Sequence, residues 1–176
     1  MSRAVFVDES GTHLALTPTH ARAPRRERAV GRVPRTRGRS TTLLAALTLD
    51  GMGPAMTVEG GTDKAVFEAS SEEGPAPTLR PGQVVVLDNV GAHQSRRARA
   101  LIEARGAHVA FLPAYSPDLS PIEHAFAKVK EHLRRAEART HEALDAAIAA
   151  ALATVTPQDA RGWFAHCGYP PAAQPL

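Results

Sequence analysis

Residues 84–88 read Val-Val-Val-Leu-Asp, and this stretch decides how the rest of the sequence is interpreted. The apolar run Val84–Leu87 follows a Pro-Gly turn and is typical of a strand covered on both faces. Asp88 comes directly after the run, at the carboxyl end of the strand, where open α/β sheets place their functional sites. The stretch therefore predicts a helix-covered sheet and one acidic site residue.

The sequence before this strand predicts a series of further strands. Ala4–Glu9 has strand character, and a period of two places Phe6 and Asp8 on the same face. His13–Thr17 is a candidate for its hairpin partner. Two more strands, joined by an Asp-Gly turn of the kind that hairpins favour, are expected at Thr41–Leu49 and Ala55–Val58.

Helical signals dominate the second half of the chain. A helix at Ser95–Arg105 and a strand at His108–Leu112 follow Asp88. Three helices are then expected within residues 120–168, with starts marked by Ser120-Pro121, His141 and Thr156-Pro157. The order predicts one α/β domain over residues 1–176, with a mixed sheet (antiparallel meander, then parallel strands) flanked by helices.

Composition sets limits on the class of protein. The chain has 176 residues, 43% hydrophobic and 22% charged, which fits one folded domain and excludes wholesale disorder. Its single cysteine, Cys167, excludes an intrachain disulfide framework and a Cys-rich zinc site. No apolar run approaches the roughly 18 residues of a membrane span, and the first residues show no signal-peptide pattern. We expect a soluble protein of the cytoplasm, without a membrane partner.

Positive charge is concentrated in a basic loop at residues 20–40. The segment Arg22–Arg39 holds eight arginines against one acid, Glu27. Such clusters usually contact phosphates in nucleic-acid-binding proteins, although a solvated basic loop has the same composition. The candidate DNA-binding residues are Arg22, Arg25, Arg26, Arg28, Arg32, Arg35, Arg37 and Arg39.

Three carboxylates lie where such a fold would bring them together. Asp8 is near the end of the first strand, Asp88 follows a buried strand, and Glu123 is in the first turn of a helix. Carboxylates this close repel one another unless a cation is present, and an all-oxygen set favours Mg²⁺ or Mn²⁺ over zinc.

Each acid also has a plain structural explanation. An Asp at a strand end often caps the following turn. Ser120 and Glu123 have capping-box spacing, in which the glutamate bonds back to the serine amide. Asp118, in the preceding loop, is an alternative third acid. Spacing alone leaves these alternatives open.

Three segments carry a resemblance to a known family. They are Phe6-Val7-Asp8-Glu9-Ser10, Val86-Leu87-Asp88-Asn89-Val90-Gly91-Ala92-His93 and Leu112-Pro113-Ala114-Tyr115-Ser116-Pro117-Asp118-Leu119-Ser120-Pro121-Ile122-Glu123. Together they resemble the catalytic domain of bacterial insertion-sequence transposases of the IS-six-thirty branch of the mariner superfamily, which are DDE superfamily endonucleases. The 34 residues between Asp88 and Glu123 match the interval used by this branch.

The resemblance implies a ribonuclease-H-like fold and a catalytic triad of Asp8, Asp88 and Glu123 that holds two Mg²⁺ or Mn²⁺ ions. It also implies DNA strand cleavage at transposon ends, followed by strand transfer into a TA target. The implied partners are transposon-end and target DNA and, in the active form, a second copy of the chain in a homodimer. His93 and Lys130 are further candidates for contact with DNA, although a lone histidine is more often structural.

Two departures from the family affect these expectations. The chain begins seven residues before Asp8, so we expect the family's N-terminal helix-turn-helix to be absent, or supplied by an upstream reading frame. The family has a full helix where this chain reads Ser70-Ser71-Glu72-Glu73-Gly74-Pro75-Ala76-Pro77, so the helix from Thr62 is expected to stop near Ser70. Two other functions remain open: a decayed fragment that binds DNA without transposing it, and a stand-alone ribonuclease-H-like nuclease.

Overall fold

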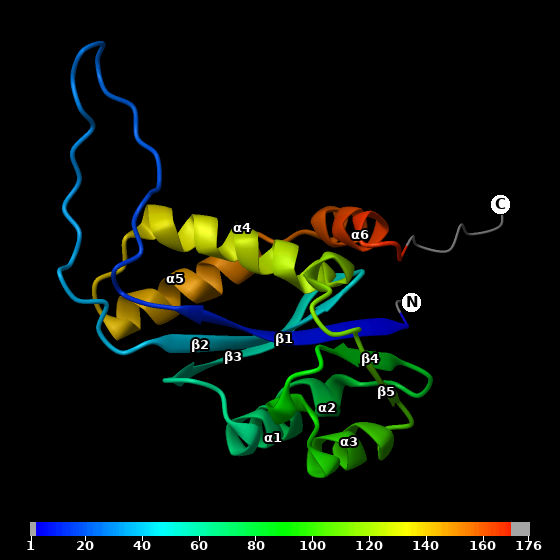
Figure 1. Cartoon of the computed structure of the whole chain (residues 1–176). Coiled ribbons are helices and arrows are strands. Elements are labelled where there is room, and N and C mark those ends of the chain that lie inside the picture. Colours follow the sequence, from blue (N-terminus) through cyan, green and yellow to red (C-terminus); the bar gives the residue numbers. More distant parts are fainter. Residues whose placement is uncertain (1–2, 170–176) are drawn as a thin grey trace.

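A five-stranded mixed sheet lies at the centre of the molecule, and the computed structural model describes residues 3–169 (Figure 1). Its strand order is β3-β2-β1-β4-β5. The first three strands form an antiparallel meander, and β4 and β5 add in parallel beside β1, which confirms the predicted mixed sheet. The strands are β1 (Ala4–Thr12), β2 (Thr41–Thr48), β3 (Gly51–Glu59), β4 (Val84–Leu87) and β5 (His108–Phe111).

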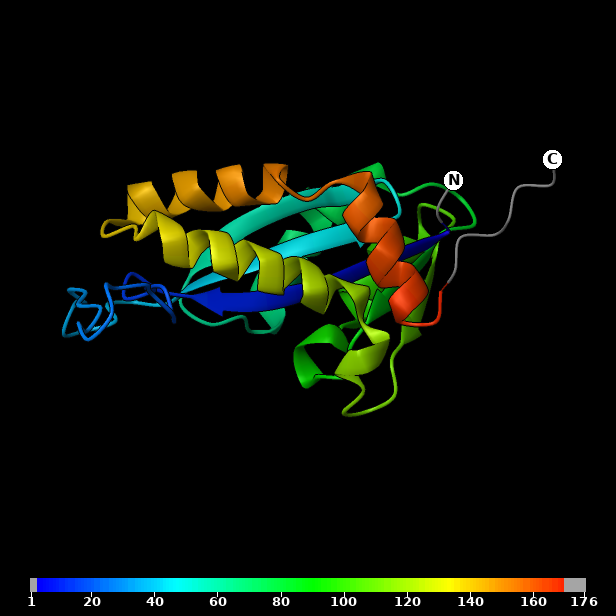
Figure 2. The ribbon, with the colours of Figure 1, turned by 90° about the horizontal axis from the view of Figure 1, so that it is seen from above.

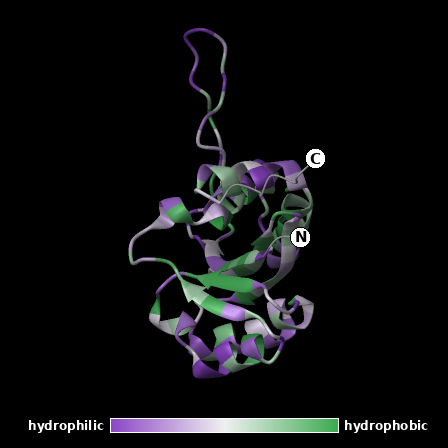
Figure 3. Ribbon diagram, turned by 90° about the vertical axis from the view of Figure 1, so that its right-hand side faces the viewer, coloured by the Kyte–Doolittle hydropathy of each residue, from purple (hydrophilic) through white to green (hydrophobic). Residues whose placement is uncertain are grey.

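Within the described residues, helices cover both faces of the sheet, with α1–α3 on one side and α4–α6 on the other (Figures 1 and 2). They are α1 (Lys64–Glu73), α2 (Pro75–Thr78), α3 (Arg96–Glu103), α4 (Pro121–Ala136), α5 (His141–Ala153) and α6 (Pro157–His166). Because strand side chains alternate, Phe6 belongs to the core beneath α4–α6, whereas Val5 and Val7 belong to the core above α1–α3. Apolar segments accordingly line the interior, as the hydropathy colours show (Figure 3).

Local capping explains where most of the helices begin. Ser95 caps α3 by accepting a hydrogen bond from the Ala98 amide, and Thr140 caps α5 in the same way. Thr156 and Asp159 form a reciprocal capping box at the start of α6. These caps confirm the predicted starts of the last helices to within a residue or two. Within residues 3–169 there is no helix long and apolar enough to cross a membrane.

The predicted hairpin partner of β1 was wrong. His13–Thr17 forms no strand, and β1 instead continues to Thr12, which pairs with Thr41 at the start of β2. Both threonine side chains are buried, so the strand pair continues up to the base of the loop. Residues 13–40, here called the arm, form no helix or strand and project from the end of this hairpin (Figure 1).

The expected break in the helix after Ala69 was also wrong. Helix α1 continues to Glu73, because the hydroxyls of Ser70 and Ser71 both donate to the Phe67 carbonyl at 2.8 Å and are thereby satisfied while buried. The chain turns at Gly74, and α2 extends the cover. This face of the sheet is therefore fully supported where the sequence departs from the family.

Strand β3 is longer than the apolar pattern indicated, since it begins at Gly51 and includes Pro54. A proline is compatible with this position because β3 is an edge strand, which pairs on one side only.

Candidate active site

The strand register places Asp8 beside Asp88. Strands β1 and β4 are parallel, with Phe6 opposite Val86, and two further residues along each strand lead to the two aspartates. Asp8 lies in the middle of β1, not near its end as predicted from the sequence. The site exists there because β4 ends at Leu87 while β1 continues, which leaves Asp8 beside the point where β4 stops.

One cavity of about 340 Å³ is lined by all three predicted acids, Asp8, Asp88 and Glu123. The loop from Leu112 to Pro117 forms another wall of this cavity. Tyr115 in that loop is fully exposed and has a left-handed backbone (φ 57°), so it stands at an open rim. Asp118 is exposed and does not line this cavity, so the geometry favours Glu123 over Asp118 as the third acid.

The expected capping box at the start of α4 does not form. Ser120 occupies the N-cap position, but its side chain makes no capping hydrogen bond. Glu123 does not bond back to the Ser120 amide, whose hydrogen bond goes to the Pro117 carbonyl. The Glu123 carboxylate is therefore free of the structural role that its spacing suggested, and it faces the cavity instead.

Burial raises the pKa of Asp8 to about 7. The hydrogen bond from the Glu9 amide to Asp8 Oδ1, at 2.8 Å, acts in the opposite direction, and the charges of Asp88, Glu9 and Glu123 raise the pKa further. Three neighbouring carboxylates thus act on one another. A cation in this cavity would relieve their mutual repulsion and favour ionised Asp8.

His93 is buried behind the acids, where sequence reasoning had made it a candidate contact for a DNA phosphate. Only 2% of the residue is exposed, so the ring lies against the acids of the site, as a hydrogen-bonded structural histidine would, and is not open to solvent. Its Nε2 lies 2.6 Å from Glu9 Oε2, and its Nδ1 contacts Asp88 Oδ1. Burial lowers the pKa of His93, but the hydrogen bond to Glu9 and the charges of Glu9, Asp88 and Asp8 outweigh that effect, so the net shift is upward.

Glu9 is a residue of this site that sequence reasoning missed. It alternates with Asp8 along β1, so it lies on the opposite face, the face of Val5 and Val7. Val5 and Val7 lie in the core on the same face of β1. A carboxylate at the next position on that face was the signal in the sequence that Glu9 has a buried partner.

The other candidate DNA contacts lie away from the cavity. Lys130 is half-buried beside Thr12, near the far end of β1. All eight arginines of the arm are exposed, and none of them lines the acidic cavity. Arg39 donates to Glu59 at 2.8 Å. The other seven arginines of the arm are the candidates for contact with a partner outside the chain.

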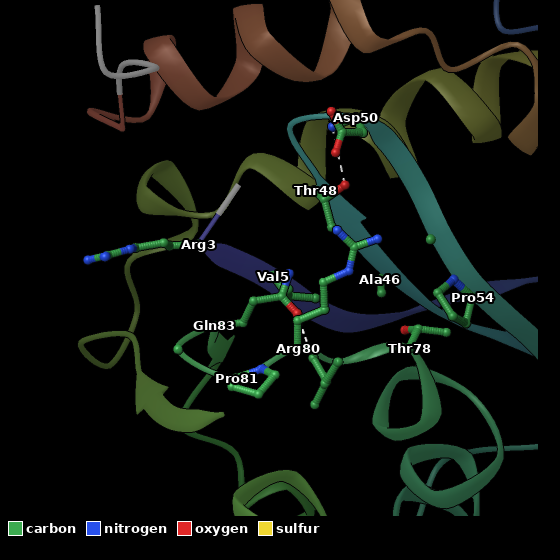
Figure 4. Close-up of a pocket in the computed structure, with 13 residues that line it drawn as sticks. Arg3, Val5, Ala46, Thr48, Asp50, Pro54, Thr78, Arg80, Pro81 and Gln83 are labelled. Atoms are coloured by element: carbon green, nitrogen blue, oxygen red, sulfur yellow. Dashed lines mark hydrogen bonds between the residues drawn. The ribbon is translucent and has the colours of Figure 1, made fainter. Parts of the chain in front are cut away.

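A larger cavity, of about 410 Å³, lies at the opposite end of β1 and β4 (Figure 4). Arg3, Thr48, Arg80 and Gln83 contribute to its lining, and Asp50 is its one carboxylate. It therefore lacks the clustered acids that the smaller cavity has. Size alone would have selected the wrong end of the sheet.

A family model described as DDE superfamily endonuclease matches residues 3–145 of the chain. The chain belongs to this family. The matched region of this DDE domain contains Asp8, Asp88 and Glu123. The chain is also similar to the Tc1 transposase of Caenorhabditis elegans, with 28% identity over 100 residues, which cover 54% of the chain and 37% of the relative.

Solved structures of Mos1 transposase share the fold of this DDE domain. A pre-cleavage Mos1 transpososome superposes with a TM-score of 0.70 at 17% identity, covering 94% of this chain and 52% of that one. The Mos1 catalytic domain with Raltegravir and Mg superposes with a TM-score of 0.66 at 20% identity, covering 96% and 79%. The likeness confirms the ribonuclease-H-like fold. The DDE domain spans about half of the transposase in the first of these structures and 37% of the Tc1 relative.

Proposed function

We propose that this domain is the catalytic part of a transposase, which cleaves DNA strands at transposon ends and transfers them to target DNA. The observation that carries the proposal is the convergence of Asp8, Asp88 and Glu123, from β1, the end of β4 and the start of α4, on one cavity. Membership of the DDE endonuclease family supports the same chemistry.

The donor set of the cavity fits divalent metal. Carboxylate oxygens of Asp8 and Asp88 lie within 4.8 Å of each other, and Glu123 adds a third carboxylate to the lining. Solved Mos1 complexes are described with Mg and with Mn. We propose that the three acids hold two Mg²⁺ or Mn²⁺ ions. When bound, such ions activate the attacking oxygen and stabilise the leaving oxygen in displacement at phosphorus.

The residues of the chain supply position and charge for that reaction. Asp8, Asp88 and Glu123 supply the negative charge that would hold the ions, and a cation beside Asp8 would favour its ionised form. The open rim at Tyr115 lets a DNA strand approach the acids from outside. The arm lies apart from the cavity, so we propose that its arginines hold DNA backbone at a distance from the reacting phosphate.

The family branch, the oligomeric state and the recognition of transposon ends belong to the same proposal. The three sequence segments support the bacterial IS-six-thirty branch, with a homodimer as the active form. An upstream helix-turn-helix reading frame would supply recognition of transposon ends to this single domain. The test is to sequence the flanking DNA for terminal inverted repeats and for that frame.

The activity test is plasmid nicking with purified protein, with and without Mg²⁺ or Mn²⁺. The variant Asp88→Asn is expected to reduce nicking to background, because the amide keeps the shape of the side chain but loses the charge that holds metal. Glu123→Gln is expected to do the same. Asp118→Asn is the matched control, since this exposed acid lies outside the cavity, and it is expected to cut like wild type.

Equal nicking by wild type and Asp88→Asn would show that another site or a contaminant cuts the plasmid. Loss of nicking in Asp118→Asn with retention in Glu123→Gln would show that Asp118 is the third acid.

A further inference from the structure

One oxygen of Asp88 is committed to contacts within the protein. Its Oδ1 accepts a hydrogen bond from the Val90 amide at 3.2 Å and is also in contact with His93 Nδ1. Both groups approach the same oxygen. The carboxylate is thereby oriented, and Oδ2 is the oxygen that remains for a ligand in the cavity.

His93 is itself fixed on several sides. Its side chain is fully buried, its Nε2 lies 2.6 Å from Glu9 Oε2, and its ring lies 4.4 Å from the ring of Phe67 in α1. Because carboxylates only accept hydrogen bonds, each ring nitrogen faces an acceptor. The imidazole therefore cannot rotate without losing its contacts to both carboxylates.

The chain of contacts crosses from one face of the sheet to the other at the carboxyl end of β4. Glu9 lies on the face of β1 that carries α1–α3, whereas Asp8 is on the face of α4, and η1 (Gly91–His93) brings His93 between Glu9 and Asp88. Glu9 and His93 are separated by 84 residues in sequence. A contact so distant in sequence links the first strand to the loop that follows β4.

We infer that Glu9 and His93 form a positioning pair that holds Asp88 with Oδ2 directed to the metal in the cavity. This inference rests on the proposed function of the cavity, because it concerns the same metal. Residues that orient metal ligands from behind typically account for about 10–100-fold in metal affinity or activity.

Two amide substitutions separate the two nitrogens of the ring. In His93→Asn the side-chain nitrogen replaces Nδ1, so the contact with Asp88 is kept and the hydrogen bond with Glu9 is lost. In His93→Gln the nitrogen replaces Nε2, so the hydrogen bond with Glu9 is kept and the contact with Asp88 is lost. The measurement is Mn²⁺ binding by calorimetry in the absence of DNA, with the metal-free melting temperature recorded for each protein.

We expect His93→Gln to weaken Mn²⁺ binding by about 10–100-fold and His93→Asn to remain much closer to wild type. Glu9→Ala, which leaves His93 in place but unanchored, is expected to weaken binding by an intermediate amount. Glu9→Gln keeps an acceptor oxygen and is expected to restore most of the affinity. The comparison of Glu9→Ala with Glu9→Gln tests the same positioning pair if either His93 variant fails to fold.

Equal weakening by the Asn and Gln variants, or unchanged Mn²⁺ affinity with lowered melting temperatures throughout, would overturn the inference and leave His93 as a core residue. The comparison is scored on metal affinity and not on cutting. A wild-type protein that binds Mn²⁺ but does not nick DNA would therefore count against the proposed function alone.

Discussion

The acidic cavity and the arm differ in how firmly their charged side chains are held. In the cavity, Asp8 and Asp88 each have one oxygen held by a backbone amide, and His93, which contacts Asp88, is buried. In the arm, most residues and all eight arginines are exposed, and the backbone forms no helix or strand. Chemistry at phosphorus requires atoms fixed to fractions of an ångström, whereas attraction to a DNA backbone requires only charge within reach.

The largest effect expected from this contrast is on the salt dependence of DNA binding. For duplex DNA, the logarithm of affinity falls with the logarithm of salt by about 0.9 for each phosphate that is neutralised. If four arm arginines contact phosphates, removing them should flatten the slope by roughly 3–4 units, equally on random DNA and on a transposon end. The variant replaces by alanine the four exposed residues Arg25, Arg28, Arg32 and Arg35.

A matched control loses the same charge from the body of the domain. It replaces the exposed residues Arg96, Arg97, Arg105 and Arg161, and its slope should change much less. A loss confined to the transposon end would mean that the arm reads sequence. An unchanged slope on both DNAs would mean that the arm is a solvated loop, and the contrast with the cavity would then fail.

A second prediction concerns how the stability of the metal-free protein depends on pH through Asp8. The folded pKa of Asp8, about 7, lies above its ordinary value of 3.8, so between these two pH values the folded state binds more protons than the unfolded state. Stability of the metal-free protein should therefore fall as pH rises through this window. Asp8→Asn removes this titration, so its melting temperature should exceed that of wild type by more at about pH 8 than at about pH 5.

Between pH 5 and the folded pKa of about 7 lie about two pKa units, or about 2.7 kcal/mol, and 1 kcal/mol shifts the melting temperature of a domain of this length by about 2–4 °C, so the effect is about 5–10 °C. Melting in EDTA measures it, and added Mg²⁺ should raise the melting temperature of wild type but not of Asp8→Asn. A difference between the two proteins that does not vary with pH would show that Asp8 is not perturbed as described.

The smallest effect is expected at the base of the arm. Arg139 donates to the carbonyls of Leu14 at 2.9 Å and Leu16 at 3.0 Å, which ties the arm to the connection between α4 and α5. Arg139→Met keeps the apolar stem and loses these bonds, at a cost of about 1 kcal/mol. Amide exchange at residues 13–17 should become roughly fivefold faster.

Arg135→Met is the control, because Arg135 pairs only with Glu131 on its own exposed helix face. Equal acceleration in both variants, or none in either, would show that Arg139 does not order the base of the arm.

The elements of the fold were predictable from the sequence where the signal is local. The run Val84–Leu87 with Asp88 behind it, the N-cap position of Ser120 and the helix starts depend on neighbouring residues, and the structure confirms them. Pairing across the arm was not predictable in this way, because nothing in His13–Thr17 indicates that the partner of β1 begins at Thr41.

The residues that support the acids from behind were not predictable for a related reason. The contact between Glu9 and His93 depends on the parallel register of β1 and β4 and on the turn at η1, which no short motif encodes. The role of Glu123 was ambiguous because its spacing suits both a cap and a cavity acid. Only the hydrogen-bond partner of the Ser120 amide separates the two.

The pairing of Thr12 with Thr41 has a consequence for how this protein can change over evolutionary time. The two strand ends are held together whatever lies between them, and the 28 residues of the arm replace a turn that about five could make. Each doubling of loop length costs only about 0.6 kcal/mol of chain entropy, so the additional length costs about 1.5 kcal/mol. Two extended limbs of about 14 residues could reach roughly 45 Å from the sheet. Insertions and deletions there leave the register of Asp8 with Asp88 unchanged, so selection can tune the span of the arm independently of the acids of the cavity.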